Sequence, residues 1–443
     1  MKRKRVLLTA FIVLICLLAA GCSGGNGETE TAEETAAVTE PKPGTIRYLN
    51  ARPELDAAWQ ALAAAYTEET GHTVIVESVE VDKYAKELKS RLGSETAPTL
   101  FEVTGPVGLQ KYRDNCLDLS GEKIYSHLLS DDYALRDGDA VKAVAYEMQA
   151  YGLIVNKPLL KEAGYSVENI DSFAKLRAIS EDITDRSGDL GFAAFTSAGM
   201  EDSSARRFKT YLANLPVYFE FQDEGITSSA TIKGTYLNNY RAVWDLYIGN
   251  STCKPGELRK KTLADSRGEF LEGKAVFYQN GSWEYEKLVG EGLFADDDLT
   301  MIPIYFGVGD EKNQGLCSGS EHYWCVNSGA AEEDLRATVD FLEWCVTSQT
   351  GKETMANEMG LICPFDTAVK TDNIFIRQDL TYLREGRKPV TWNIQAMPPK
   401  SWRTGVGKAL IRYAEDQRDS RWYEVEEAFI DGWETEYQAA NGK

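Results

Sequence analysis

Histidine and basic residues are scarce in this sequence, and each shortage excludes a class of function. The 443 residues include 3 histidines, His72, His127 and His322, which are far apart. Histidine-based acid–base catalysis is therefore not expected. No Cys/His spacing typical of zinc sites occurs, so we expect neither a metal nor a cofactor. Lys and Arg total 48 against 69 Asp and Glu, a formal net charge of −21. Such an acidic chain lacks the basic footprint of a nucleic-acid-binding protein.

Several short enzyme motifs are also missing. The chain has no G-x-G-x-x-G after a strand, no P-loop, no H-E-x-x-H and no G-x-S-x-G. Aspartate and glutamate are abundant, so a glycan-cleaving enzyme with two catalytic carboxylates stays open as an alternative.

The first 21 residues predict a secretory signal. Basic residues at positions 2–5 precede an apolar run from Leu7 to Leu18, shorter than the roughly 20 residues that span a membrane. The run ends in Ala-Ala-Gly-Cys22, which resembles the lipobox where bacterial lipoproteins are cut and acquire a lipid anchor. We expect lipidation at Cys22; a plain signal peptide is the alternative. Residues 22–44 are rich in Gly, Glu, Thr and Pro and predict a flexible acidic tether.

Six further cysteines follow the tether: Cys116, Cys253, Cys317, Cys325, Cys345 and Cys363. Their spacing does not choose a disulfide pairing, although Cys317 and Cys325 are the nearest pair. We favour buried free thiols, because a core of this size needs no disulfides.

Helix and strand patterns alternate from Thr45 onward. Leu55, Trp59, Leu62 and Tyr66 recur at helical spacing between strand-like segments at 45–49 and 72–79, and a second helix precedes a strand at 98–103. This β-α-β-α-β order predicts a mostly parallel α/β sheet. Further strands are expected at 151–156, 191–195, 275–278, 300–304 and 322–326. Further helices are expected at 157–165, 171–185, 202–215, 235–250, 262–272, 282–291, 331–349, 351–358 and between 402 and 440.

Six segments carry a resemblance to a known family. They are Tyr66–Val76, Ser94–Phe101, Tyr151–Lys157, Phe270–Trp283, Phe341–Trp344 and Gly360–Pro364. In this order they resemble the extracellular solute-binding proteins of ABC importers, family 1, in the sugar-binding branch that includes maltose-binding protein. The block Phe270-Leu-Glu-Gly-Lys-Ala-Val-Phe followed by Asn280-Gly-Ser-Trp is the most specific of the six.

The resemblance implies a two-lobed periplasmic-binding-protein-like fold of type II, with a cleft between the lobes. The chain would cross between lobes three times, near Tyr146–Glu147, Ile304–Phe306 and Gly360–Pro364. Lobe one would comprise 45–146 plus 307–360, and lobe two 147–306 plus 361–443. Such clefts close by hinge motion around their ligand.

The resemblance and the placement at strand ends together predict a set of ligand-binding residues. Trp283 would stack on a sugar ring, with Tyr285 nearby; core packing of Trp283 is the alternative. Glu54 has a helix-dipole role as its alternative, and a solvated loop is the alternative for Glu321 and His322. We expect Trp344, Trp422 and Trp433 in the core. The full candidate set is Asn50, Arg52, Glu54, Glu102, Thr104, Glu147, Gln149, Trp283, Tyr285, Glu321, His322, Trp402 and Arg403.

The resemblance therefore implies a substrate-binding lipoprotein that captures a carbohydrate, in particular an oligosaccharide, and passes it to ABC permease subunits. It would be anchored through Cys22 at the outer face of the cytoplasmic membrane and would break no bond. A peptide, glycerol phosphate or polyamine ligand is the alternative within the same class.

Overall fold

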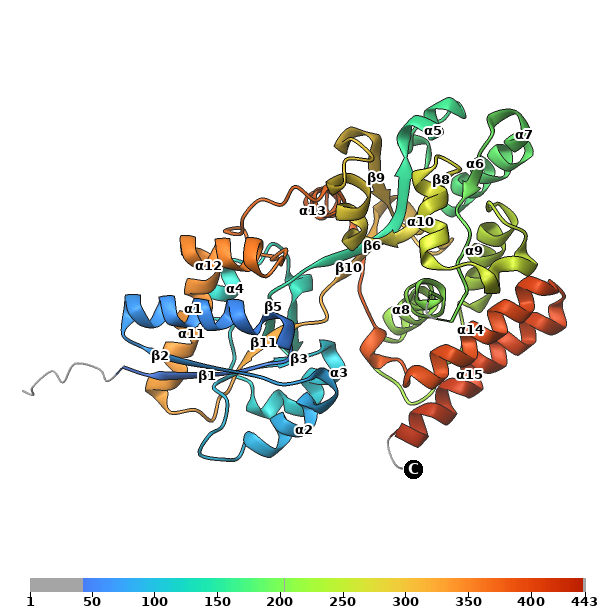
Figure 1. Ribbon diagram of the computed structural model, residues 1–443. Coiled ribbons are helices and arrows are strands. Elements are labelled where there is room, and N and C mark those ends of the chain that lie inside the picture. The colour runs from blue at the N-terminus through green and yellow to red at the C-terminus, as the bar shows by residue number, and fades with distance from the viewer. Residues whose placement is uncertain (1–42, 203, 441–443) are drawn as a thin grey trace, which may run out of the picture. The chain divides into compact units, whose positions relative to one another are not determined.

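The computed structural model describes residues 43–202 and 204–440, which form two β-sheets covered by helices (Figure 1). The predicted signal peptide, Cys22 and all but the last residues of the tether lie outside these ranges. No helix within them is both long enough and apolar enough to cross a membrane.

The first sheet and the helices packed on it are called the first lobe below. Its strands are β1 (Thr45–Asn50), β2 (Thr73–Ser78), β3 (Leu100–Val103), β4 (Ala134–Asp137), β5 (Ala140–Ala145) and β11 (Tyr323–Val326), in the order β2-β1-β3-β11-β5-β4. Its helices are α1 (Asp56–Thr70), α2 (Val81–Arg91), α3 (Gly105–Tyr112), α4 (Lys123–Ser126), α11 (Glu332–Thr347) and α12 (Gln349–Glu353). β1 runs parallel to β2 and β3 because a helix separates each of these consecutive strands in sequence. In Figure 1, α1 and α12 lie on one face of this sheet and α2 on the other.

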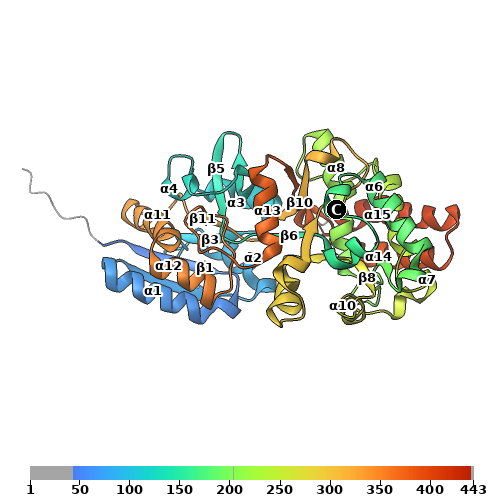
Figure 2. The ribbon, with the colours of Figure 1, turned by 90° about the horizontal axis from the view of Figure 1, so that it is seen from above.

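The second sheet and its helices are called the second lobe. Its strands are β6 (Gln149–Asn156), β7 (Ala193–Phe195), β8 (Ala275–Gly281), β9 (Leu299–Ile302), β10 (Gln314–Gly319) and β12 (Lys388–Val390); the order is β12-β10-β6-β8-β7, and β9 also pairs with β6. Its helices are α5 (Lys157–Glu162), α6 (Phe173–Asp185), α7 (Ser187–Leu190), α8 (Asn214–Glu224), α9 (Leu237–Gly249), α10 (Leu263–Leu271), α13 (Ile374–Arg384), α14 (Lys400–Glu415) and α15 (Asp419–Ala440). Helix α13 packs against β6, β9 and β10 (Figure 2). Three segments expected to be ordinary helix contain π-helical turns, at Arg207–Leu212, Glu286–Gly290 and Thr354–Glu358.

The chain passes from one sheet to the other in three places. The first passage is the short segment between β5 and β6, and the third is the loop between Gly360 and α13, where Met148 N–H donates to Ile362 O at 2.7 Å. The second passage was expected near Ile304–Phe306. The strand pairing corrects this, because β10 pairs with β6 and β12 and therefore belongs to the second sheet. The chain returns to the first lobe only between β10 and β11, so residues 314–319 do not belong to lobe one.

Large aromatic side chains fill the interior of each lobe. Trp422 and Trp433 are buried as predicted, in the core of the second lobe. The six cysteines of the described chain are free thiols, and Cys116, Cys317, Cys325 and Cys345 are buried. Cys317 lies on β10 and Cys325 on β11, so the pair nearest in sequence is divided between the two sheets.

A buried carboxyl group links the two lobes. Asp379 on α13 is 1% exposed, and its Oδ2 accepts a hydrogen bond from Ser318 Oγ at 2.5 Å. The same Ser318 hydroxyl is 3.1 Å from the hydroxyl of Tyr133, in the first lobe. Burial raises the pKa of Asp379 from 3.8 to about 7. The charged form is therefore disfavoured in the folded protein.

Asp379→Asn is expected to stabilise the protein at neutral pH. The aspartate contributes fully to folding below pH 3.8, and this contribution is lost as pH rises toward its raised pKa. The variant should exceed the parent in unfolding free energy by roughly 2–4 kcal/mol near pH 7, and the difference should shrink toward pH 4. Urea unfolding at a series of pH values measures it. Asp297→Asn, at an exposed position, is the control, and a pH-independent difference for Asp379→Asn would contradict the interpretation.

Candidate functional site

A buried glutamate organises the first-lobe side of the site. Glu102 lies one residue before the end of β3 and accepts hydrogen bonds from the hydroxyls of Tyr48 at 2.7 Å and Tyr146 at 2.8 Å, and from the Ala51 N–H at 2.9 Å. Its fourth partner is His322 Nδ1 at 3.1 Å. Burial acts to raise the pKa of Glu102, but the hydrogen bond and charge of His322 outweigh it, so this pKa is lowered. Glu102 is therefore a charged anchor for the groups around it.

His322 extends this arrangement toward the solvent. Burial acts to lower its pKa, but the hydrogen bond to Glu102 and the charges of Glu102 and Glu147 outweigh burial and raise it. Its Nε2 is 3.9 Å from Glu147 Oε1, and the opposite oxygen of Glu147 is 2.6 Å from Arg52 Nη1. Arg52 Nε in turn lies 2.9 Å from Glu54. The result is a continuous row of alternating charges, which we call the polar row: Glu102, His322, Glu147, Arg52 and Glu54.

Asn50 holds the end of this row in place. Its amide donates to Arg52 O and to Ser78 Oγ, both at 2.8 Å, and its Oδ1 accepts from the Arg52 N–H at 3.0 Å. These bonds fix the loop after β1, from which Arg52 reaches Glu147.

The second lobe supplies a group of aromatic rings, which we call the aromatic wall. The Trp283 ring centroid lies 6.0 Å from that of Tyr151 and 5.4 Å from that of Tyr211, and Tyr211 is 5.8 Å from Trp392. Tyr151 and Tyr211 are buried, whereas Trp283 is 39% exposed. Trp283 therefore packs on buried rings while its outer part stays accessible. This exposure is not expected of a tryptophan that only packs the core.

Gly281 allows the indole of Trp283 to fold back over the end of β8. A Cβ atom at this position would lie 2.3 Å from the Trp283 ring. The backbone at Gly281, with φ −105°, suits any residue, so only the close approach of the ring requires glycine.

Gly281→Ala should therefore displace the indole without straining the backbone. We expect ligand affinity to fall about 10-fold, because a displaced anchor ring loses its contacts. A ligand titration followed by tryptophan fluorescence measures the loss. Gly256→Ala is the control, since its Cβ would meet nothing within 4 Å; unchanged affinity of Gly281→Ala would contradict the role of the ring position.

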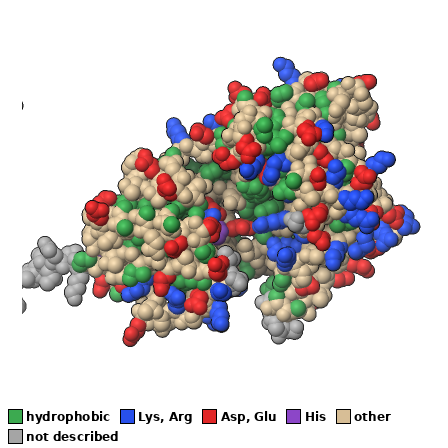
Figure 3. Space-filling view, viewed as in Figure 1, with side chains coloured by type: hydrophobic (Ala, Val, Ile, Leu, Met, Phe, Trp, Pro, Cys, Tyr) green, Lys and Arg blue, Asp and Glu red, His purple; other side chains and the backbone are tan. Residues whose placement is uncertain are grey.

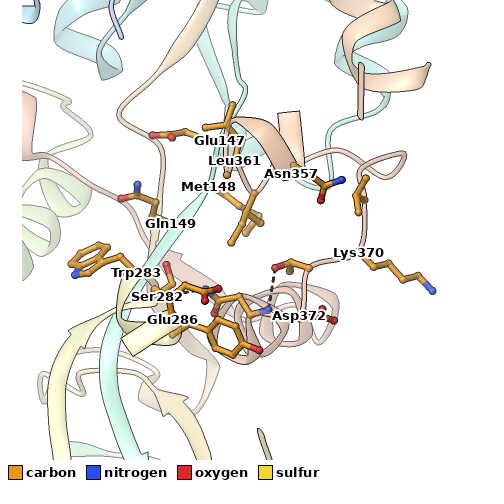
Figure 4. Close-up of a pocket in the computed structure, with 17 residues that line it drawn as sticks. Glu147, Met148, Gln149, Ser282, Trp283, Glu286, Asn357, Leu361, Lys370 and Asp372 are labelled. Carbon is orange, nitrogen blue, oxygen red and sulfur yellow. Dashed lines mark hydrogen bonds between the residues drawn. The ribbon is translucent and has the colours of Figure 1, made fainter. Parts of the chain in front are cut away.

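One of two cavities between the lobes adjoins both the polar row and the aromatic wall. The first, of about 430 Å³, is lined by Glu147, Gln149, Trp283 and Tyr285 among others. Figure 4 shows Glu147, Gln149 and Trp283 projecting to the same side of β6, while Lys370 and Asp372 lie on the other side. The second cavity, of about 710 Å³, is lined by Glu321 and Arg403. In Figure 3 acidic groups and a histidine face basic groups in the hollow between the lobes.

Three residues that were predicted to contact the ligand are instead buried in the protein. Asn50, Glu102 and Trp402 are 0%, 2% and 1% exposed. The polar atoms of Asn50 and Glu102 are bonded within the protein, as described above. The indole N–H of Trp402 donates to Phe429 O at 2.9 Å, and its ring packs on Phe429 and Trp433. Trp402 is a core residue, and the other two support neighbours of the site.

The remaining candidates are unequally placed. Thr104 is exposed and lines neither cavity, and the Glu54 side chain is 61% exposed at the end of the polar row.

Three residues near the site were not predicted from the sequence: Tyr211, Trp392 and Arg206. The guanidinium of Arg206 lies 5.2 Å from the centre of the Tyr211 ring and 3.9 Å from Glu321. No motif marks these three residues, and the predicted helix at 202–215 gave no indication of which face meets the cleft.

Comparisons with known proteins agree with this arrangement. A sequence model of the bacterial extracellular solute-binding proteins matches residues 61–379. The chain belongs to this family. No curated protein sequence matches it.

Solved structures share the fold of this solute-binding protein. MsmE from Bacillus subtilis gives a TM-score of 0.68 at 14% identity, covering 91% of this chain and 100% of that one. A family 1 extracellular solute-binding protein from Bifidobacterium longum gives 0.66 at 16% identity, covering 89% and 99%. RafE from Streptococcus pneumoniae gives 0.64 at 16% identity, covering 89% and 99%. The solute-binding protein thus has the two-lobed periplasmic-binding-protein fold of type II, and the cavities lie where the two lobes face each other.

Proposed function

We propose that the protein captures a carbohydrate, in particular an oligosaccharide, between its lobes and delivers it to the permease subunits of an ABC importer. The observation that carries this proposal is the exposed Trp283 ring beside Glu147 and Gln149 in one cavity. The C–H face of a sugar ring packs on a flat aromatic ring, while its hydroxyls need polar partners. Both are present here: Trp283 follows β8, Gln149 begins β6, and Glu147 lies in the passage just before it.

The ligands of structurally similar proteins support a carbohydrate. RafE has been solved in complex with raffinose and GacH in complex with acarbose, and another neighbour is a chitin oligosaccharide binding protein. By analogy, the contacts in this protein would come from Arg52, Glu147, Gln149, Trp283, Tyr285, Glu321, His322 and Arg403. Closure of the lobes around the sugar would exclude water and strengthen these hydrogen bonds.

In this proposal the protein carries its ligand and breaks none of the ligand's bonds. A glycosidase needs one carboxyl group with a raised pKa to act as the general acid. The pKa of Glu102 is lowered and its oxygens are fully occupied, and Glu147 is paired with Arg52. Glu102 is therefore unsuited to donate a proton to a sugar, which favours binding over cleavage.

We further propose that a lipid on Cys22 holds the protein at the outer face of the cytoplasmic membrane. The sequence Ala-Ala-Gly-Cys22 and the extracellular family support this location. A secreted solute-binding lipoprotein from Streptomyces coelicolor is among the similar structures. Cys22→Ser should release the protein into the medium of expressing cells; retention at the membrane would contradict the anchor.

Titration with a panel of oligosaccharides tests the central proposal. Purified protein is titrated calorimetrically with raffinose, maltotriose and chitotriose, with a peptide, glycerol phosphate and a polyamine as competing ligand classes. Saturable binding of a saccharide, recovered intact by chromatography, is the expected result. Binding of only a non-saccharide would replace the carbohydrate assignment, and turnover of a bound sugar would overturn the carrier function.

A further inference from the structure

The larger of the two cavities carries more positive charge than its surroundings. Its charged lining residues are Lys111, Arg206 and Arg403 against the single carboxylate of Glu321. The whole chain has the opposite balance, with 69 acidic and 48 basic residues. A local cationic excess in an acidic protein points to a function at this place.

The two arginines are poorly neutralised. Arg206 Nη2 lies 3.9 Å from Glu321 Oε1, beyond hydrogen-bond distance, and 57% of its side chain is exposed. Arg403, partly buried, has no hydrogen bond or ion pair among the described residues. Burial lowers the pKa of Arg403, the neighbouring Arg206 lowers it further, and Glu321 opposes them only through space. Two guanidinium groups thus share one distant carboxylate.

These cations adjoin the aromatic wall. Arg206 stacks over Tyr211 with its guanidinium carbon 5.2 Å from the ring centre, and Tyr211 contacts Trp283 at 5.4 Å. Arg206 thus lies over a ring that packs against Trp283, and Arg403 lines the same cavity as Arg206. Guanidinium groups bind carboxylates and sulfates through paired charge-assisted hydrogen bonds.

We propose that the preferred ligand is an anionic saccharide, whose negative group is bound by Arg206 and Arg403. This inference rests on the proposed carbohydrate function and specifies its substrate class. The negative group would be the carboxylate of a uronic acid or a sulfate ester, which present the same chemistry to the two arginines. Glu321 would then act as their partner in the absence of ligand.

Matched pairs of ligands separate charge from shape. Trigalacturonate is compared with its methyl ester, and a sulfated chondroitin disaccharide with its desulfated form, by calorimetric titration. We expect the charged member of at least one pair to bind about 10-fold more tightly or better. The pair that responds identifies carboxylate or sulfate. Raising the salt from about 50 mM to about 500 mM should weaken only the charged member.

Variants at the two arginines test the assignment. Arg206→Gln and Arg403→Gln should each weaken binding of the charged ligand about 10-fold more than they weaken binding of the neutral member. Arg403→Lys, which keeps the charge, should recover part of the loss. Arg177→Gln is the control, because Arg177 has the same 57% exposure and the same 3.9 Å separation from a carboxylate, Glu181, on α6. Circular dichroism of each variant verifies folding.

The outcomes distinguish this inference from the proposed function. If saccharides bind, but the neutral member of both pairs binds as tightly as the charged member or more tightly, the anionic assignment is overturned. Carbohydrate capture is then left intact. Equal losses for charged and neutral ligands in the arginine variants also overturn it. If no saccharide binds, charged or neutral, the proposed function fails and this inference with it.

Discussion

Trp283→Ala is expected to weaken saccharide binding by about 10- to 100-fold, because the substitution removes the accessible ring of the aromatic wall. Trp283 is 39% exposed and rests on the rings of Tyr151 and Tyr211. Removal of the indole also exposes Tyr211, so part of the lost affinity comes from hydration of the aromatic wall. Calorimetric titration with the tightest saccharide found in the panel measures the effect.

Two further variants test whether the effect depends on the position of Trp283 and on the presence of a flat ring there. Tyr423→Ala removes another large exposed aromatic side chain, 64% exposed on α15, and should leave affinity unchanged. Trp283→Phe should retain part of the affinity, since a smaller flat ring remains. Unchanged binding by Trp283→Ala would remove stacking from the site and leave the family assignment in place.

Glu102→Ala is expected to destabilise the folded protein by about 3–5 kcal/mol, since it removes the buried charge to which four groups donate. Tyr48, Tyr146 and the Ala51 N–H would lose their acceptor, and the His322 imidazolium would lose its nearest anion. Urea unfolding at pH 6 measures the change. Glu54→Ala, at a carboxylate that is 61% exposed, should cost about 1 kcal/mol or less.

The pH dependence of this effect has a definite sign. The pKa of Glu102 is lowered, so its contribution is present above its ordinary value of 4.5 and is lost as pH falls through the lowered pKa. The pKa of His322 is raised, so its contribution is complete below its ordinary value of 6.5 and is lost as pH rises through the raised pKa. The stability lost in His322→Gln should therefore be greatest between pH 4.5 and 6.5. A loss independent of pH would show that the pair contributes by packing alone.

The order of secondary structure was accessible from the sequence because it depends on local periodicity. The spacing of Leu55, Trp59, Leu62 and Tyr66 marks α1, and the strand-like segments around it are β1 and β2. The second passage between lobes was misplaced because β10 is assigned to its sheet by pairing with β6, which lies more than a hundred residues earlier. Sequence periodicity contains no information on such pairing.

The site was predicted in part for the same reason. Trp283 was predicted from its place after a strand, and Glu147 and Gln149 from the first crossing between lobes; all three line one cavity. Sequence position could not show that Glu102, also near a strand end, is enclosed by Tyr48 and Tyr146, or that Trp402 turns into the core. Tyr211 and Arg206 lie in and beside a π-helical turn without a motif, so only their contacts reveal them.

The sequence by itself determined the fold class, the family resemblance and the acidic character of the chain, because motif order and composition are properties of neighbouring residues. The tertiary structure decided which polar atoms remain free to meet a ligand. The answer depends on partners that are far apart in the sequence. His322 bonds to Glu102, 220 residues away, and Arg52 bonds to Glu147, 95 residues away. Burial and ion pairing are long-range outcomes of folding, and they leave Arg206 and Arg403 with the single carboxylate of Glu321 in one cavity, where Arg206 lies over Tyr211 of the aromatic wall.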